Sequence, residues 1–68
     1  LHSQSKAEFL AKLQISIKEA NETLYWLELL YETDYITKEM YNSIYPECVE
    51  LAKLLTSIIK TTKANHKL

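Results

Sequence analysis

Glycine is absent from this 68-residue chain, and proline occurs once, at Pro46. Globular proteins contain about 7% glycine and about 5% proline, and both residues are concentrated in turns. A chain that has so little of either has few turns. The composition therefore predicts an all-α protein made of long helices with few connections.

Cysteine is also scarce, since Cys48 is the only one. No disulfide can form within the chain, and such cysteine usage is typical of a reducing, cytoplasmic compartment. No run reaches the roughly 18 consecutive apolar residues of a membrane span, and no charged-then-apolar leader precedes the first periodic segment. We therefore expect a cytoplasmic chain without a membrane segment. Because 68 residues bury only a small core, we also expect a partner to contribute to its stability.

A first helix is predicted over residues 5 to 32. Ser5 and Glu8 form a Ser-x-x-Glu capping box, in which each side chain accepts a hydrogen bond from a backbone N–H that has no partner within the helix. The apolar residues then recur at spacings of three and four, which is the pattern of a helix packed along one neighbour. These seam residues are Leu10, Leu13, Ile17, Ala20, Leu24, Leu27 and Tyr31.

A turn over residues 33 to 37 and a second helix over residues 38 to 62 follow. Asp34 can adopt the left-handed conformation that usually requires glycine after a helix, and Thr37 can cap the second helix. So short a connection makes the helices antiparallel neighbours. The apolar side expected on the second helix, which is wider than a two-helix seam requires, comprises Tyr41, Ile44, Tyr45, Cys48, Leu51, Ala52, Leu55, Ile58 and Ile59.

Pro46 falls inside this second helix. Proline removes one hydrogen bond of the helix and collides with the carbonyl group four residues earlier, at a cost of roughly 3 kcal/mol. The apolar stripe on both sides of Pro46 favours a kink over residues 42 to 45. The alternative is two separate helices with Pro46 at the start of the second.

Four stretches, at residues 5–13, 15–23, 25–30 and 54–61, carry a resemblance to a known family. The chain resembles the C-terminal half of the four-helix-bundle proteins encoded by intervening sequences in bacterial 23S ribosomal RNA genes. It is also similar in fold to the accessory variability determinant of diversity-generating retroelements. The most specific motifs are Lys-Glu-Ala-x-Glu-Thr-x-Tyr-Trp, from Lys18 to Trp26, and Leu-Leu-Thr-Ser-Ile-Ile-Lys-Thr, from Leu54 to Thr61.

The resemblance implies a hairpin that is half of a four-helix bundle, with two further helices upstream. It also implies ring-like homo-oligomers, often pentamers, and no settled activity; nucleic-acid binding has been proposed for the retroelement relatives. The chain departs from the family pattern at Asp34, where the turn usually has glycine, and at Pro46. Both departures bear on the helical register near the turn, that is, on which side chains of the two helices face each other there.

Charge is distributed unevenly along the predicted hairpin. Residues 1–18 and 51–68 together hold seven Lys and one Glu, or +6, whereas residues 19–50 hold eight acids and one Lys, or −7. The basic end is a candidate phosphate-contacting patch, and the alternative is a solvated helix terminus. The absence of arginine argues against sequence-specific readout. The candidate contacts are Lys6, Lys12, Lys53, Lys60, Lys63 and Lys67.

Aromatic residues gather toward the turn, where they could be a stacking platform for bases or packing within a core and an interface. Because this end is acidic and would repel phosphate, packing is the better interpretation. The aromatic residues concerned are Tyr25, Trp26, Tyr31, Tyr35, Tyr41 and Tyr45.

Catalytic patterns are weak. Glu19 and Glu22 share a helical face but lack the Glu-x-x-His pair of carboxylate-bridged metal bundles. His2 and His66 fall near the ends of the chain. Cys48 lies on the apolar side of the second helix, and no histidine is placed to activate its thiol. We therefore expect neither enzyme activity nor a metal or cofactor.

The first helix carries a second apolar flank, and the second helix has apolar residues beyond its seam, so two helices alone leave apolar surface uncovered. The sequence predicts a non-enzymatic interaction or assembly module, with a non-specific RNA- or DNA-binding scaffold as the alternative. The partner would be another copy of the chain, as a homo-oligomer, or upstream helices. The expected interface residues are Ile15, Trp26, Leu29, Val49 and Leu54.

Overall fold

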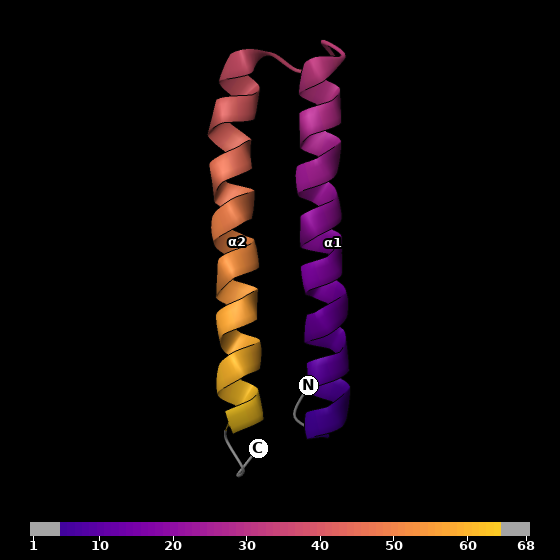
Figure 1. The fold of residues 1–68 in the computed structure, drawn as a ribbon, viewed down its shortest axis with the longest axis vertical. Helices are drawn as coiled ribbons and strands as arrows, with labels where there is room; N and C mark the ends of the chain where they lie inside the picture. The colour runs from indigo at the N-terminus through magenta and orange to yellow at the C-terminus, as the bar shows by residue number, and fades with distance from the viewer. Residues whose placement is uncertain (1–4, 65–68) are drawn as a thin grey trace.

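The protein is an antiparallel hairpin of two helices. The computed structural model describes residues 5–64, and it contains α1 (Lys6–Glu32) and α2 (Lys38–Ala64), each of 27 residues. Figure 1 shows the two helices side by side along their whole length, with both ends of the chain on one side and the turn on the other. The dimensions are 47 × 16 × 15 Å, so the molecule is a rod. The prediction of an all-α helical hairpin is confirmed, and no strand occurs among residues 5–64.

The start of α1 is fixed by its first four residues. The backbone N–H of Glu8 donates to Ser5 Oγ at 3.1 Å, and the backbone N–H of Ser5 donates to Glu8 Oε1 at 3.4 Å. The predicted capping box is therefore present, with Ser5 as the N-cap just before the first helical residue.

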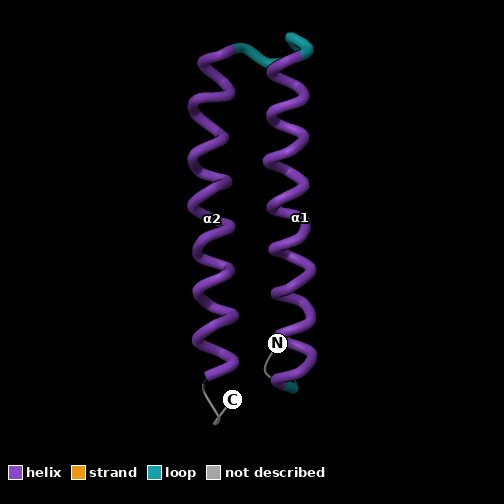
Figure 2. The backbone as a smooth tube through the Cα atoms, viewed as in Figure 1, coloured by secondary structure: helices purple, strands orange, loops and turns teal. Residues whose placement is uncertain are grey.

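The turn ends α1 with Asp34 in the left-handed region, at φ 64°. The N–H of Asp34 donates to the carbonyl oxygen of Tyr31 at 3.1 Å, and the N–H of Tyr35 donates to that of Leu30 at 2.8 Å. This pair of bonds is a Schellman motif, which is usually built on glycine. The left-handed conformation was predicted at Asp34 because aspartate tolerates it better than most residues do. Figure 2 shows the short connection that results.

Thr37 starts α2 by accepting a hydrogen bond from the N–H of Met40 at 3.1 Å, as the sequence predicts. The helix then runs without a break through Pro46 to Ala64 (Figure 2). The alternative of two separate helices is therefore wrong, and no element boundary falls near residues 42–45. Packing along α1 offsets the missing hydrogen bond of the proline.

The contact between the helices forms a thin core. Its buried residues are Ala20, Leu27, Ile59 and Thr62, and no side chain among the described residues is fully enclosed. The other predicted seam residues of α1 are half-buried. Two helices touch along one line only, so each side chain in the seam keeps one edge open to solvent.

Two apolar residues of α2 do not belong to the seam. Ile44 and Leu51 are exposed, although the sequence grouped them with the seam residues in one apolar side that is wider than a two-helix seam requires. Leu51 precedes Ile59 by eight residues and therefore lies about 80° around the helix from it. That rotation turns Leu51 past the edge of α1. In the described part of the chain, neither helix is long and apolar enough to cross a membrane.

Candidate interaction surface

One side of α2 carries a row of exposed apolar residues, which we call the apolar face. Met40, Ile44, Leu51 and Leu54 follow one another at spacings of four, seven and three, so they lie along one side of the helix. Their side chains are between 42% and 56% exposed. A second heptad stripe of this kind is typical of a helix that packs against two neighbours. Within residues 5–64, α1 is the one helix that packs against α2.

Helix α1 adds exposed apolar residues of its own. Ile15, Trp26 and Leu29, which were predicted as interface residues, are all exposed, with Trp26 at 54%. Trp26 packs edge-on against Tyr25, with ring centroids 5.5 Å apart, and this pair leaves most of the indole in solvent. Large side chains that remain exposed together mark an interaction surface more often than a solvated one.

The total exposed area supports the same interpretation. The accessible surface is 5450 Å², whereas a compact monomer of 8.0 kDa exposes about 4,450 Å². The excess is about 1,000 Å². One partner in a stable protein–protein complex buries about 800 Å², so the hairpin exposes enough additional surface for one such interface.

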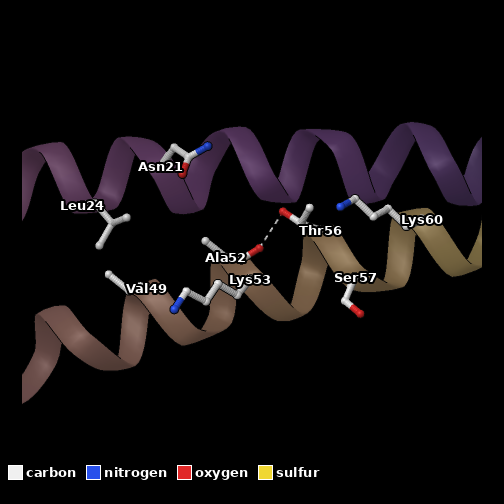
Figure 3. Close-up of a pocket in the computed structure, with 8 residues that line it drawn as sticks. All are labelled: Asn21, Leu24, Val49, Ala52, Lys53, Thr56, Ser57 and Lys60. Atoms are coloured by element: carbon white, nitrogen blue, oxygen red, sulfur yellow. Dashed lines mark hydrogen bonds between the residues drawn. The ribbon is translucent and has the colours of Figure 1, made fainter.

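A shallow groove of about 430 Å³, lined by both apolar and polar side chains, lies between the helices (Figure 3). Ile44 precedes Lys53, and Leu51 precedes Lys60, by nine residues, which is about 180° around the helix. The apolar face and the groove are therefore on opposite sides of α2. The lining residues are Asn21, Leu24, Val49, Ala52, Lys53, Thr56, Ser57 and Lys60.

The groove has little that would hold a small ligand firmly. Thr56 Oγ1 donates to the carbonyl oxygen of Ala52 at 2.9 Å, and Lys53 Nζ lies 3.8 Å from Glu50 Oε1 (Figure 3 draws the Thr56 bond). Among the described residues, no buried side-chain polar atom lacks a hydrogen-bond partner. A built polar site usually has several converging groups in an enclosed pocket, and this groove is open.

Val49 is placed differently from the other predicted interface residues. It is half-buried, and in Figure 3 it lies near Leu24 at one end of the groove. Leu54, five residues later, is about 140° further around α2 and belongs to the apolar face. The structure thus separates these two residues, which the sequence analysis had grouped together.

Among the candidate nucleic-acid contacts, the structure brings Lys53 and Lys60 together and places Lys12 apart from them. Lys53 and Lys60 line the groove two turns apart, whereas Lys12 precedes Asn21 by nine residues and lies on the opposite side of α1 from it. Lys6 and Lys63 lie in the first turn of α1 and the last turn of α2, respectively. Lys67 lies outside the described residues.

Three tyrosines form a stack near the turn. The rings of Tyr31 and Tyr41 are stacked with centroids 4.6 Å apart, and those of Tyr41 and Tyr45 are 4.8 Å apart. The hydroxyl of Tyr45 donates to Glu28 Oε2 at 2.9 Å, which ties α2 to α1. Burial in the stack, followed by the negative charge of Glu28, raises the pKa of Tyr41. The hydrogen bond to Glu28 raises the pKa of Tyr45.

The described residues hold no group of three or more His, Cys, Asp or Glu side chains placed to bind a metal ion. Cys48 is a free, half-buried thiol on the seam. Glu19 and Glu22 are exposed on α1, and His2 and His66 lie outside the described residues. The geometry therefore defines a helical hairpin with a row of exposed apolar side chains along α2.

This hairpin belongs to a known class of helical proteins. The profile of the family described as "23S rRNA-intervening sequence protein" matches residues 1–57, so the chain belongs to that family, as the resemblance predicted. A crystal structure at 1.70 Å resolution, of a protein of unknown function from the S23 ribosomal protein family of Bacteroides thetaiotaomicron, is similar, with a TM-score of 0.81 and 59% identity. No curated protein matches the chain.

The similar crystal structure is a longer protein. The match covers 87% of the present chain and 53% of that one, so this chain spans about half its length. Neither the family description nor the description of that protein indicates a catalytic activity.

Part of the apolar face was not predicted from the sequence. Met40 was not assigned to any surface, and Ile44 and Leu51 were grouped with the seam residues in one apolar side wider than a two-helix seam requires. The signal was present in the sequence, because the spacings of four, seven and three from Met40 to Leu54 form a second stripe beside the first. This second stripe was not recognised, because all apolar residues of α2 were assigned to one wide side of the helix.

Proposed function

We propose that this protein is a non-enzymatic assembly module, which completes a helical bundle by packing its apolar face against further helices. The observation that carries the proposal is the row of Met40, Ile44, Leu51 and Leu54, exposed along one side of α2 while Lys53, Ser57 and Lys60 lie on the opposite side. Burial of apolar surface stabilises by roughly 25 cal/mol per Å², so covering four such side chains offers several kcal/mol.

The thin core of the isolated hairpin supports this proposal. Small domains are stable by only about 5–15 kcal/mol, and this hairpin buries three apolar residues along one line of contact. Additional helices would enclose the seam residues that are now half-buried. The similar crystal structure is about twice as long as the match, which is consistent with a bundle larger than one hairpin.

A pair of charge substitutions tests the proposal. Leu54→Glu places a carboxylate on the apolar face, at its C-terminal end, whereas Ser57→Glu adds the same charge to the same helix on the groove side. We expect Leu54→Glu to abolish assembly, measured as molar mass by light scattering, and Ser57→Glu to leave it unchanged. Equal masses for the wild type and both variants would contradict the proposal.

The alternative is a non-specific nucleic-acid scaffold, and one observation favours it. Lys53 and Lys60 lie on one side of α2, in a segment from residue 51 onward that contains no acidic residue. Such a scaffold would bind RNA and DNA with an affinity that falls steeply as salt rises, and Lys53→Gln with Lys60→Gln would reduce that dependence. No binding at low salt would exclude it.

A further inference from the structure

The tyrosine stack near the turn brings three oxidisable side chains together beside one base. The ring centroids of Tyr31 and Tyr41 are 4.6 Å apart, and those of Tyr41 and Tyr45 are 4.8 Å apart. The hydroxyl of Tyr45 donates to Glu28 Oε2 at 2.9 Å, which is close enough for the carboxylate to take the phenolic proton. Assembly through the apolar face does not use these side chains, so it does not account for their arrangement.

We propose that the stack is a site of oxidative modification, at which a one-electron oxidant joins Tyr41 and Tyr45 by a covalent bond between their rings. The oxidant is a small species from outside the protein, such as an oxygen-centred radical. The product is a dityrosine that links two residues four positions apart in α2. The proposal is independent of the assembly function, because both tyrosines belong to one helix of one hairpin.

Tyr45 loses the first electron because its proton has an acceptor. The hydrogen bond to Glu28 raises the pKa of Tyr45, so the phenol is protonated at neutral pH. Loss of an electron makes a phenol strongly acidic, and the electron leaves most readily where a base takes the proton at the same time. Glu28 is that base, and the result is a neutral tyrosyl radical beside a protonated carboxyl group. Of the five tyrosines in the chain, Tyr45 is the one whose hydroxyl is bonded to a carboxylate in the described structure.

Tyr41 is the partner because its ring lies against that of Tyr45. A second oxidation removes an electron and the hydroxyl proton from Tyr41, and water takes this proton. The two radicals then form a bond between ring carbons next to the hydroxyl groups, and the hydrogens on those carbons move to the oxygens as both rings become aromatic again. The pair loses two electrons and two protons in total. Because the rings are in contact before the reaction, joining within the chain is favoured over joining between chains.

Exposure alone predicts a different product. Tyr35 is 79% exposed and Tyr25 is 62% exposed, whereas Tyr41 and Tyr45 are half-buried. An oxidant that acted according to exposure would modify the first two. In the described part of the chain, the ring of Tyr35 contacts no other aromatic ring, and that of Tyr25 contacts Trp26. These two tyrosines would therefore be joined between copies, giving covalent dimers instead of a modified single chain.

Oxidation of the folded chain in a Cys48→Ser background tests the proposal. The thiol is removed because Cys48 follows Tyr45 by three residues on the same side of α2 and would return an electron to the radical. We expect photogenerated ruthenium(III), a one-electron oxidant, to produce dityrosine fluorescence in chains of unchanged length that are lighter by two hydrogen atoms. Cleavage after lysine should place the whole mass change in fragment 39–53 and leave fragment 19–38 unmodified.

Matched variants separate the two roles. Glu28→Gln keeps a hydrogen-bond acceptor but takes no proton at neutral pH, and it should lower the initial rate of cross-linking severalfold. Glu22→Gln removes the same charge from an exposed position on α1 and should leave the rate unchanged. Tyr45→Phe should abolish the product within the chain, and Tyr35→Phe should not affect it. Circular dichroism before oxidation confirms that each variant is helical.

Three results would refute the proposal. A bond between Tyr31 and Tyr41, which would keep the two lysine fragments joined, would show that Tyr45 is not the residue oxidised. Covalent dimers as the main product would show that exposure governs the reaction. Equal rates for Glu28→Gln and the parent chain would show that the carboxylate does not act as the proton acceptor.

Discussion

The two sides of α2 differ more than the two helices differ from each other. On one side Ile44 and Leu51 are exposed, and on the other, nine residues further along the chain in each case, Lys53 and Lys60 line an open groove between the two helices. A helix in contact with one neighbour needs one apolar stripe, and a second stripe indicates a second neighbour.

The largest expected effect is the difference in free energy of unfolding between a substitution in the seam and one on the apolar face. Leu27→Ala removes a side chain that is only 9% exposed and should cost about 2–5 kcal/mol in the free energy of unfolding. Leu54→Ala should cost about 1–3 kcal/mol if the apolar face is covered in solution, and under about 0.5 kcal/mol if it is solvated. Denaturant unfolding of both variants, with Ser57→Ala as the groove-side control, measures the contrast. If Leu54→Ala and Ser57→Ala change the free energy of unfolding equally, the two sides of α2 do not differ in burial in solution.

Pro46 gives the next largest effect. Replacing it with alanine restores a backbone donor inside a continuous helix and should stabilise α2 by about 1–3 kcal/mol. Thermal unfolding monitored by circular dichroism measures the change. A loss of stability or of assembly would show that the proline shapes α2 for packing on the apolar face.

The turn gives a smaller effect. Asp34 holds the left-handed conformation at φ 64°, which glycine adopts without a steric penalty. Asp34→Gly should therefore raise the stability by about 0.5–1 kcal/mol without changing the mass of the assembly. An unchanged or lower melting temperature would mean that the aspartate side chain stabilises the turn by more than its backbone conformation costs.

The tyrosine stack gives the smallest effect, which is confined to alkaline pH. The pKa values of Tyr41 and Tyr45 are raised, so folding favours the protonated phenols. That stabilisation is complete below the unfolded-state pKa of about 10, and it is lost as pH rises through the higher folded-state values. Tyr45→Phe, which cannot donate to Glu28, should lose less stability than the wild type between pH 9 and about 11. Identical pH profiles would show that the hydrogen bond has no influence on stability.

Local signals in the sequence were sufficient for the helix ends. The capping box of Ser5 and Glu8, the left-handed Asp34 and the cap at Thr37 depend on residues within one turn of each other, and all are present in the structure. The continuity of α2 through Pro46 could not be decided in this way, because it depends on packing along α1.

The surfaces were less predictable for a related reason. Ile44 and Leu51 are as apolar as their neighbours in the seam, so residue type alone does not distinguish them from it. Val49 was grouped with Leu54 although about 140° separates them. The hydrogen bond from Tyr45 to Glu28 joins residues 17 positions apart, and no local sequence pattern predicts such a contact.

The central claim is that folding and assembly through the apolar face are one event. The most direct test is the melting temperature of the wild-type chain across a hundredfold range of protein concentration, with molar mass measured at each concentration. Coupled folding and association predicts a melting temperature that rises with concentration and a mass above 8.0 kDa wherever the chain is folded. A melting temperature independent of concentration, from a folded species of 8.0 kDa, would contradict the claim.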